Sequence, residues 1–128
     1  MVGNYIGTTA GGTAALPNGN TGVLIMEGAR DNSVGGDTPG ARNVIGGHSG
    51  AGVVIQDTGT NGNQVIGNLI GTNASGTAAL GNGMGVVVSY GAQENVIGGT
   101  TAAARNVISG NTEVGISIQN SSTCLLYT

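Results

Sequence analysis

Residues 52–72 read GVVIQDTGTNGNQVIGNLIGT and hold three short apolar segments separated by turn residues. The first of these segments, GV-x-[IV], occurs four times along the chain at intervals of 30, 33 and 30 residues. The four copies are GVLI at 22–25, GVVI at 52–55, GVVV at 85–88 and GISI at 115–118. A fixed period of this size is typical of a solenoid or a propeller, in which each repeat packs against its neighbours.

A larger unit of about 63 residues contains two such coils and is present nearly twice. The matching segments are 3–8 with 67–72, 22–36 with 85–99, and 41–47 with 104–110. Met1 and Val2 align with Val65 and Ile66, so the chain is expected to begin inside a strand.

Each coil is predicted to form three strands. In the first strand, Ser117 indicates that the middle residue points outward while the Val and Ile residues on either side point inward. The second strand is predicted to carry Val34, Ile66 and Ile97. The third strand is predicted to carry Ile6, Ile45, Ile70 and Ile108, and the residues two positions earlier are Asn4, Asn43, Asn68 and Asn106.

Stacking the coils would place like residues above one another at about 4.8 Å, the spacing between strands of a sheet. The glycine pairs at 35–36, 46–47 and 98–99 are expected at corners that need a positive φ. The four Asn residues are expected to adopt the same backbone conformation and to bond a neighbouring coil through their amides. The apolar ladders are too small to stabilise the coil alone, so these hydrogen bonds must contribute.

Composition excludes several classes of function. The 128 residues include 27 Gly, no Phe and no Trp, and only 7% are charged, with a formal net charge of −3. Three Arg and no Lys cannot form a basic surface for nucleic acid, so no nucleic-acid partner is expected. The chain also lacks a run of about 18 apolar residues, so no membrane span is expected.

The segments NVIGG, RNVISGN, GISIQ and GNYIGT and the GTAAL loop resemble repeats of large secreted or surface-exposed bacterial proteins. These proteins contain right-handed parallel β-helices of the pectate-lyase-like superfamily, and the resemblance covers about residues 2–123. It implies an all-β fold, a right-handed parallel β-helix (β-solenoid) of about four coils with three short strands per coil. It also implies an extracellular or cell-surface location. It does not imply an activity, because this fold carries lyases, hydrolases, epimerases, adhesins and inert stalks.

The C-terminal residues depart from the repeat. Residues 1–123 are expected to form a parallel β-helix fragment that is truncated at both ends, with neighbouring coils of the same longer chain as its partners. Residues 124–128, CLLYT, lack the Asn and Gly of the repeat. Our hypothesis is that they are translated sequencing-adapter sequence, and the alternative is a genuine final half-strand.

Loops are expected at two different edges in alternate coils. The inserts at 37–41 and 100–104 precede the third strand, whereas the long loops at 9–21 and 73–84 follow it. This alternation predicts that no single edge collects enough loops to enclose a cleft.

The most suggestive group of side chains follows the first strand, where Glu27, Asp57, Tyr90 and Asn120 are predicted to stack in register. Glu27 and Asp57 would lie about one strand spacing apart. At that distance one carboxylate could raise the pKa of the other, or both could bind a Ca²⁺ ion. The alternative is a pair of turn carboxylates that point into water, since Ca²⁺ needs six or more oxygen ligands.

Arg42 and His48 are the remaining weak catalytic candidates. Lyases of this fold use a basic residue to remove a proton next to a carboxylate, and Arg42 could serve in that way. Its repetition as Arg105 favours a structural role beside the insert loop. His48, in GGHSG, distantly resembles a motif of pectin-degrading glycosidases, but the accompanying acidic motifs are absent, which favours a surface turn.

Two functions follow from these observations. The first is a non-catalytic structural or interaction module of a larger exported bacterial surface protein, with a polysaccharide or cell-surface ligand as a further partner. The second is a fragment of a polysaccharide-active lyase, hydrolase or epimerase. An enzyme should gather carboxylates and a base on one groove, whereas a spacer should distribute its polar residues around the coil.

Overall fold

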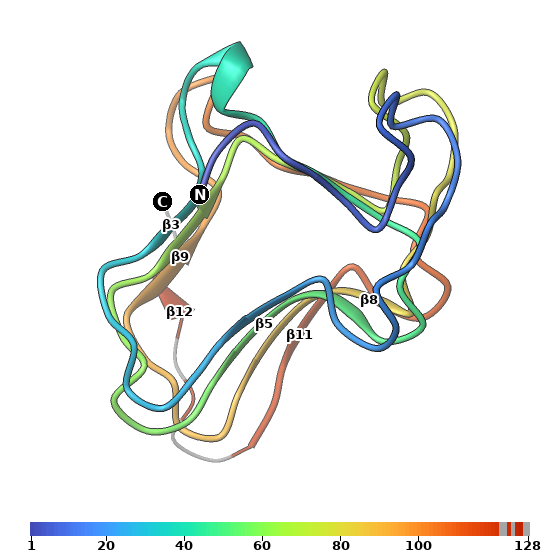
Figure 1. Cartoon of the computed structure of the whole chain (residues 1–128). Helices are drawn as coiled ribbons and strands as arrows, with labels where there is room; N and C mark the ends of the chain where they lie inside the picture. The colour runs from blue at the N-terminus through green and yellow to red at the C-terminus, as the bar shows by residue number, and fades with distance from the viewer. Residues whose placement is uncertain (121–122, 124, 127–128) are drawn as a thin grey trace.

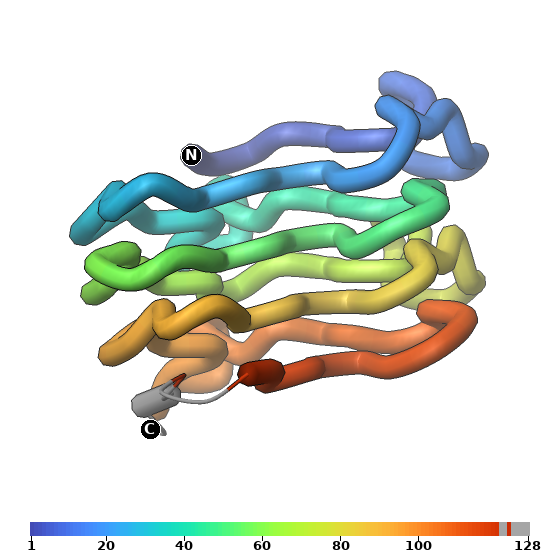
Figure 2. Tube along the Cα trace, turned by 90° about the horizontal axis from the view of Figure 1, so that it is seen from below, coloured from blue at the N-terminus to red at the C-terminus, as the bar shows by residue number. Residues whose placement is uncertain are grey.

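The computed structural model is a right-handed parallel β-solenoid with three sheets, which confirms the predicted fold class; it has about three turns, whereas the sequence predicted about four coils. It describes residues 1–120 and 123, and the backbone of 125 and 126. Seen from its N-terminal end in Figure 1, the chain runs clockwise as it recedes, which is the right-handed sense. Figure 2 shows the coils stacked as layers, with the N-terminus at the top.

Each sheet contains four parallel strands, one from each level of the solenoid. The first strands of the coils form a sheet of β2 (Val23–Ile25), β5 (Ala51–Gln56), β8 (Met84–Ser89) and β11 (Ile116–Ile118). The second strands form a sheet of β3 (Ser33–Gly35), β6 (Gln64–Ile66), β9 (Asn95–Ile97) and β12 (Leu125–Leu126). The third strands form a sheet of β1 (Tyr5–Ile6), β4 (Val44–Ile45), β7 (Leu69–Ile70) and β10 (Val107–Ile108). One short 3₁₀ helix, η1 (Pro39–Ala41), lies in the first insert.

The predicted side-chain directions of the first strand are confirmed. Val53 and Ile55 are fully buried, and the next coil places Val86 and Val88 in register with them. The middle residue Leu24 is 51% exposed. The alternation of the first strand therefore separates an apolar interior from an outer surface.

The second strand shows one difference from the sequence prediction. Val34 pairs with Val65 and not with Ile66, and Val65 in turn pairs with Ile97. Val65 is fully buried whereas Ile66 is only partly buried. The shift by one residue exchanges the two faces of a strand, and two adjacent apolar residues gave no alternation from which to choose between them.

The Asn residues before the third strand form the predicted hydrogen-bonded ladder. The Nδ2 group of Asn43 donates to Oδ1 of Asn68 at 2.9 Å, and Nδ2 of Asn68 donates to Oδ1 of Asn106 at 3.2 Å. The same pattern recurs at a second corner, from Asn32 to Asn63 and on to Asn95. These side chains therefore join consecutive coils in addition to the backbone pairing.

Glycine provides the left-handed backbone beside this ladder. Gly35 has a φ of +86°, and a side chain there would collide with the Ile66 carbonyl and the Asn68 amide. None of the Asn residues at positions 4, 43, 68 and 106 has a positive φ, so that part of the prediction is wrong. Gly67, which precedes Asn68, takes the positive φ instead, at +70°.

The loops emerge at two corners in alternate coils, as predicted (Figure 1). The two long loops nevertheless contact each other, because the Ala74 N–H donates to the Gly12 carbonyl at 2.9 Å. At the C-terminus, the backbone of β12 pairs with β9. The prediction of a non-native tail at 124–128 concerns residues that otherwise lie outside those described.

Replacing Asn68 by Ala should destabilise the solenoid strongly. The change removes the acceptor of Asn43 and the donors to Asn106 and the Val34 carbonyl. A buried polar group without a partner costs roughly 1–3 kcal/mol, so we expect a loss of about 3 kcal/mol or more. Urea unfolding followed by circular dichroism measures this loss. The control is Asn18→Ala in an exposed loop, which should change the stability by less than about 0.5 kcal/mol; equal effects of the two changes would contradict the role of the ladder.

Candidate functional site

The residues that follow the first strand of each coil stack at one corner, as predicted. Glu27, Asp57, Tyr90 and Asn120 all have a positive φ, between 52° and 79°. Oδ2 of Asp57 accepts a hydrogen bond from the backbone N–H of Glu27 at 3.2 Å. The Asp57 carboxylate therefore binds the backbone of the preceding coil, while Glu27 is exposed.

This corner offers few ligands for a metal ion. Over the part of the chain that the structure describes, no group of three or more His, Cys, Asp or Glu side chains is placed to bind a metal. Because Ca²⁺ takes six to eight oxygen ligands, Glu27 and Asp57 would supply only a small share of the set.

Arg42 lies at a different corner, between the second and third strands. Its Nε group donates to the carbonyl of Gly67 in the next coil at 3.1 Å. This contact fixes the end of the first insert to the coil beneath it, which is the structural role that its repetition favours. The Arg30 Nε group makes a similar bond to the Gly59 carbonyl.

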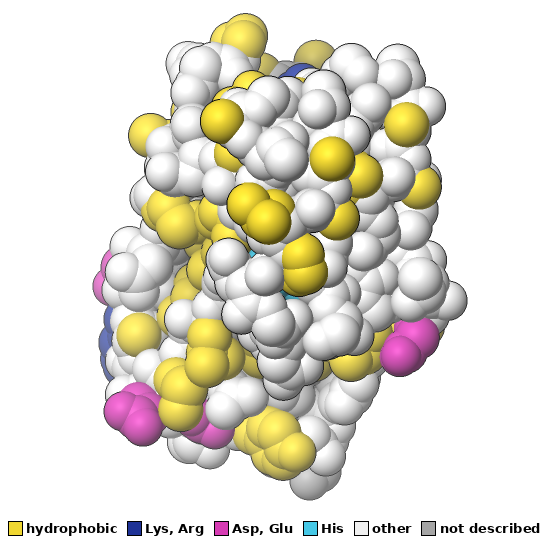
Figure 3. All heavy atoms as spheres, turned by 45° about the vertical axis from the view of Figure 1, so that its right-hand side comes forward, with side chains coloured by type: hydrophobic (Ala, Val, Ile, Leu, Met, Phe, Trp, Pro, Cys, Tyr) yellow, Lys and Arg dark blue, Asp and Glu magenta, His cyan; other side chains and the backbone are white. Residues whose placement is uncertain are grey.

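His48 lies at the third corner and is buried, with 2% of its surface exposed. The interpretation of His48 as a surface turn residue is therefore wrong. Figure 3 faces this corner and shows only traces of the imidazole between other side chains. The backbone N–H of His48 donates to Oδ1 of Asn82, and Asn82 donates to Asn111 in the next coil. His48 thus occupies one level of a third side-chain ladder, where the sequence alignment places an Asn.

The imidazole of His48 packs beneath two glycines of the preceding coil. A side chain at Gly7 would collide with the ring, and a Cβ at Gly22 would lie 2.8 Å from Nε2. Among the described residues, neither ring nitrogen makes a hydrogen bond of good geometry, although the Ile6 carbonyl lies close enough to favour the protonated ring. Desolvation lowers the pKa of His48 below the ordinary value of 6.5, and the Ile6 carbonyl opposes this effect only in part. The neutral imidazole is therefore the form that suits this site.

The structure does not bring the four candidate catalytic residues together. Glu27 and Asp57 share one corner, Arg42 lies at the second, and His48 lies inside the third. On the face shown in Figure 3, the acidic side chains lie near the margins and not in its centre.

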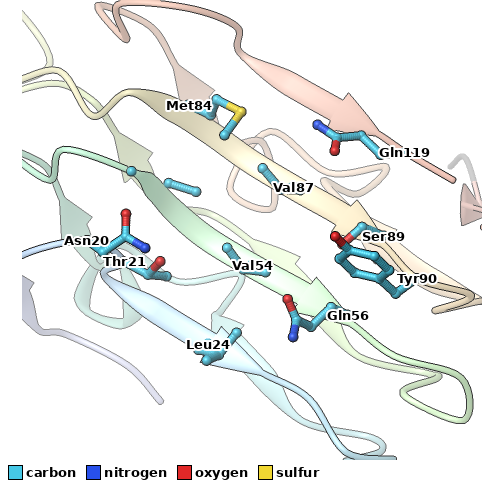
Figure 4. A pocket seen from close by; sticks show the side chains of 12 residues that line it. Asn20, Thr21, Leu24, Val54, Gln56, Met84, Val87, Ser89, Tyr90 and Gln119 are labelled. Carbon is cyan, nitrogen blue, oxygen red and sulfur yellow. The ribbon is translucent and has the colours of Figure 1, made fainter.

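A different feature gathers polar side chains, on the outer face of the sheet that contains β5 and β8. A shallow groove of about 310 Å³ lies there, with an apolar floor and amide or hydroxyl groups along it. Figure 4 shows Tyr90 at one end of the groove, beside Ser89. The lining residues are Asn20, Thr21, Leu24, Gly50, Ala51, Val54, Gln56, Met84, Val87, Ser89, Tyr90 and Gln119, none of which carries a charged side chain.

Part of this groove could have been predicted from the alternation of inward and outward residues in the first strand. Leu24, Val54 and Val87 occupy the outward parity of the first strand, so their alignment predicts an apolar stripe outside the coil. Asn20 and Thr21 could not be assigned in this way, because they come from a loop whose path the repeat does not specify.

Comparisons with known proteins give no match: no family model matches the chain, and no curated protein or solved structure matches it significantly. Among the described residues, no helix has the length and apolar character that crossing a membrane requires.

The buried His48 should make the stability of the protein depend on pH. Its pKa is 6.5 when unfolded and lower when folded, so between these two values the unfolded state binds more protons. Falling pH therefore favours unfolding in this interval, by at most about 1.4 kcal/mol per pH unit for one proton. Stability should be fully retained above pH 6.5 and should decrease below it, as measured by urea unfolding at a series of pH values.

The matched variant is His48→Asn, which places the usual ladder residue at this level. His48 is the only histidine in the chain, so the variant should lose the part of the pH dependence that begins near pH 6.5. An unchanged pH profile in the variant would show that His48 does not cause it.

Proposed function

We propose that the protein is a non-catalytic structural module, a rigid β-solenoid spacer within a larger exported bacterial surface protein. The observation that carries this proposal is that three of the candidate catalytic side chains make contacts between coils. Asp57 binds the backbone of Glu27, Arg42 binds the carbonyl of Gly67, and His48 is enclosed between coils. Each of these three residues contributes to coil stacking.

The polar residues of the interior support the same proposal. Three ladders of amide side chains connect the coils at separate corners, and they repeat with the period of the chain. Such ladders restrict bending and local opening, because a displaced coil must break side-chain and backbone hydrogen bonds together. A rigid rod with loops at alternate corners fits a spacer that holds other parts of a protein at a fixed distance.

The alternative function is a fragment of a polysaccharide-active enzyme, and the outer groove favours it. An exposed aromatic ring and neutral amides are groups that can stack on and hydrogen-bond to sugars. Tyr90 is 62% exposed, and Gln56 at the end of β5 and Gln119 just after β11 line the same groove on either side of β8. The nearby carboxylates Glu27 and Asp57 would then be the acid and base, with the extracellular location common to both proposals.

A panel of acidic and neutral polysaccharides separates these two functions. The spacer proposal expects no new reducing ends and no unsaturated products above the level of a Glu27→Gln, Asp57→Asn double variant. It also expects that Tyr90→Ala leaves any retention on immobilised polysaccharide unchanged. Cleavage that the double variant abolishes would overturn the spacer proposal and support the enzyme.

Limited proteolysis tests the rigidity that a spacer requires. A protease of broad specificity should first cleave the exposed loops, within 9–21 or 73–84, because backbone bonds in stacked strands must open before cleavage. Mass spectrometry of the early fragments identifies the cut sites, and gel filtration shows whether the fragments stay together. Early cleavage inside β5 or β8 would argue against a rigid solenoid.

A further inference from the structure

We propose that the corner at residues 46–50 is a pH-sensitive latch: protonation of His48 releases residues 19–22 of the coil above it, while the three sheets stay paired. The inference goes beyond the proposed function, because a spacer need not respond to pH. It also differs from a loss of overall stability, because one corner opens while the strands on either side of it remain in place.

The ring of His48 is enclosed by backbone of the coil above. It belongs to a residue that is 2% exposed, and a side chain at Gly7 would collide with it. A Cβ atom at Gly22 would lie 2.8 Å from Nε2. Figure 3 shows traces of the imidazole between the atoms that cover it, so the cover is thin. A small displacement of residues 19–22 would therefore bring the ring into contact with water.

No opposite charge is available to a protonated His48. The three coils that meet at this corner contribute residues 3–22, 43–56 and 67–89. These segments contain no Asp, Glu, Lys or Arg, and Tyr5 is their only other titratable side chain. Tyr5 is 50% exposed and lies against Gly12. A buried imidazolium would have the Ile6 carbonyl beside it but no carboxylate, and a buried charge without a partner strongly favours exposure to water.

The side-chain ladder at this corner is interrupted above His48. The N–H and the Nδ2 group of Asn82 both donate to Oδ1 of Asn111 at 3.1 Å, and the His48 N–H donates to Oδ1 of Asn82 at 3.2 Å. The next level up is Gly19, whose carbonyl bonds to Ser49, the residue after His48, just as the Asn82 carbonyl bonds to the residue after Asn111. Glycine has no amide side chain, so this ladder does not join His48 to the coil above.

A small set of hydrogen bonds holds residues 19–22 on the corner. The Gly19 carbonyl accepts from the Ser49 N–H at 3.2 Å and from the Ser49 hydroxyl at 3.1 Å. The Asn20 carbonyl accepts from the Gly50 N–H at 2.8 Å, and the Gly22 N–H donates to the Ala51 carbonyl at 3.0 Å. These bonds lie before the start of β2, so they can open while β2 stays paired with β5.

Acid drives the opening because the exposed ring can be hydrated. Burial lowers the pKa of His48 in the closed corner, and exposure to water returns the pKa toward 6.5. Below pH 6.5 the open form therefore binds more protons than the closed form, and its population rises as the pH falls. Above pH 6.5 the ring is neutral in both forms, and the corner stays closed.

Amide hydrogen exchange followed by NMR measures this opening residue by residue. The reporters are the Ser49 and Gly50 amides, which donate to the segment that leaves. After correction for the intrinsic effect of pH on exchange, their protection should fall by up to about tenfold between about pH 7.5 and about pH 5.5. It should also stay well below the protection of the hydrogen-bonded amides of β5 and β8, because the sheets remain paired.

Thr112 is the matched control within the same molecule. Its N–H and its hydroxyl donate to the Asn82 carbonyl, as those of Ser49 donate to the Gly19 carbonyl. The ladder residue at that corner is Asn111 in place of His48. The protection of the Thr112 amide should therefore not change over the same pH range.

The variant His48→Asn should lose the pH effect at Ser49 and Gly50, and circular dichroism confirms that it is folded. Three results in the unmodified protein would overturn the proposal. They are constant protection at Ser49 and Gly50, an equal fall at Thr112, and protection at Ser49 and Gly50 as high as in β5 and β8. The first shows that the corner does not respond to pH, and the other two show that the response is not confined to it. A pH effect that persists in folded His48→Asn would also overturn it.

Discussion

The structure depends on the ability of one asparagine amide to bind the coil before it and the coil after it. Asn68 accepts from Asn43 through Oδ1, and its Nδ2 group donates to Val34 on one side and to Asn106 on the other. A primary amide has two N–H donors and an acceptor oxygen, so a single side chain can satisfy both directions. No other short neutral side chain offers this combination, which explains why the ladder that contains Asn68 has Asn at all four levels, 4, 43, 68 and 106. The described core consists of aliphatic side chains without an aromatic residue, and these bonds add to the strand pairing that aligns the coils.

The same constraint explains where the chain is irregular. Gly35 and Gly67 have a left-handed backbone beside the ladder, whereas Arg42, which precedes Asn43, has a φ of −64°. Segments that do not have to stack on an equivalent segment of the next coil can differ in length between coils. These segments are the inserts and the long loops at alternate corners. His48 is the exception inside a ladder. Its ring makes no hydrogen bond of good geometry within the described part of the chain, and it fits only because Gly7 and Gly22 above it have no side chains.

The ladders also explain why the proposed function is structural. A catalytic group must face a substrate and change its protonation or bonding during the reaction. Asp57 and Arg42 instead bind backbone groups of adjacent coils, and His48 is shielded from solvent. The outer groove differs from the corners in that none of its lining side chains is charged, and it extends to Tyr90, which is 62% exposed at the corner after the first strand.

Sequence alone determined the fold, because a solenoid is built from contacts between equivalent positions. The period of the GVxI segments gave the strand order, the parity of Ser117 gave the inward face, and the recurring Asn gave the ladder. The same reasoning could not fix the register of the second strand. Val65 and Ile66 are adjacent and both apolar, so the sequence does not show which of the two points inward.

Only the tertiary structure decided the environment of the candidate site residues. His48 looked like a turn residue because its flanking glycines and serine are typical of turns, yet the coil above covers its ring. The partners of Asp57 and Arg42 are backbone atoms about 25 to 30 residues away in the chain, and a carbonyl or an N–H leaves no signature in the sequence. Periodicity specifies which positions stack, whereas the direction of each side chain depends on the backbone angles at irregular corners, where the repeat carries no information.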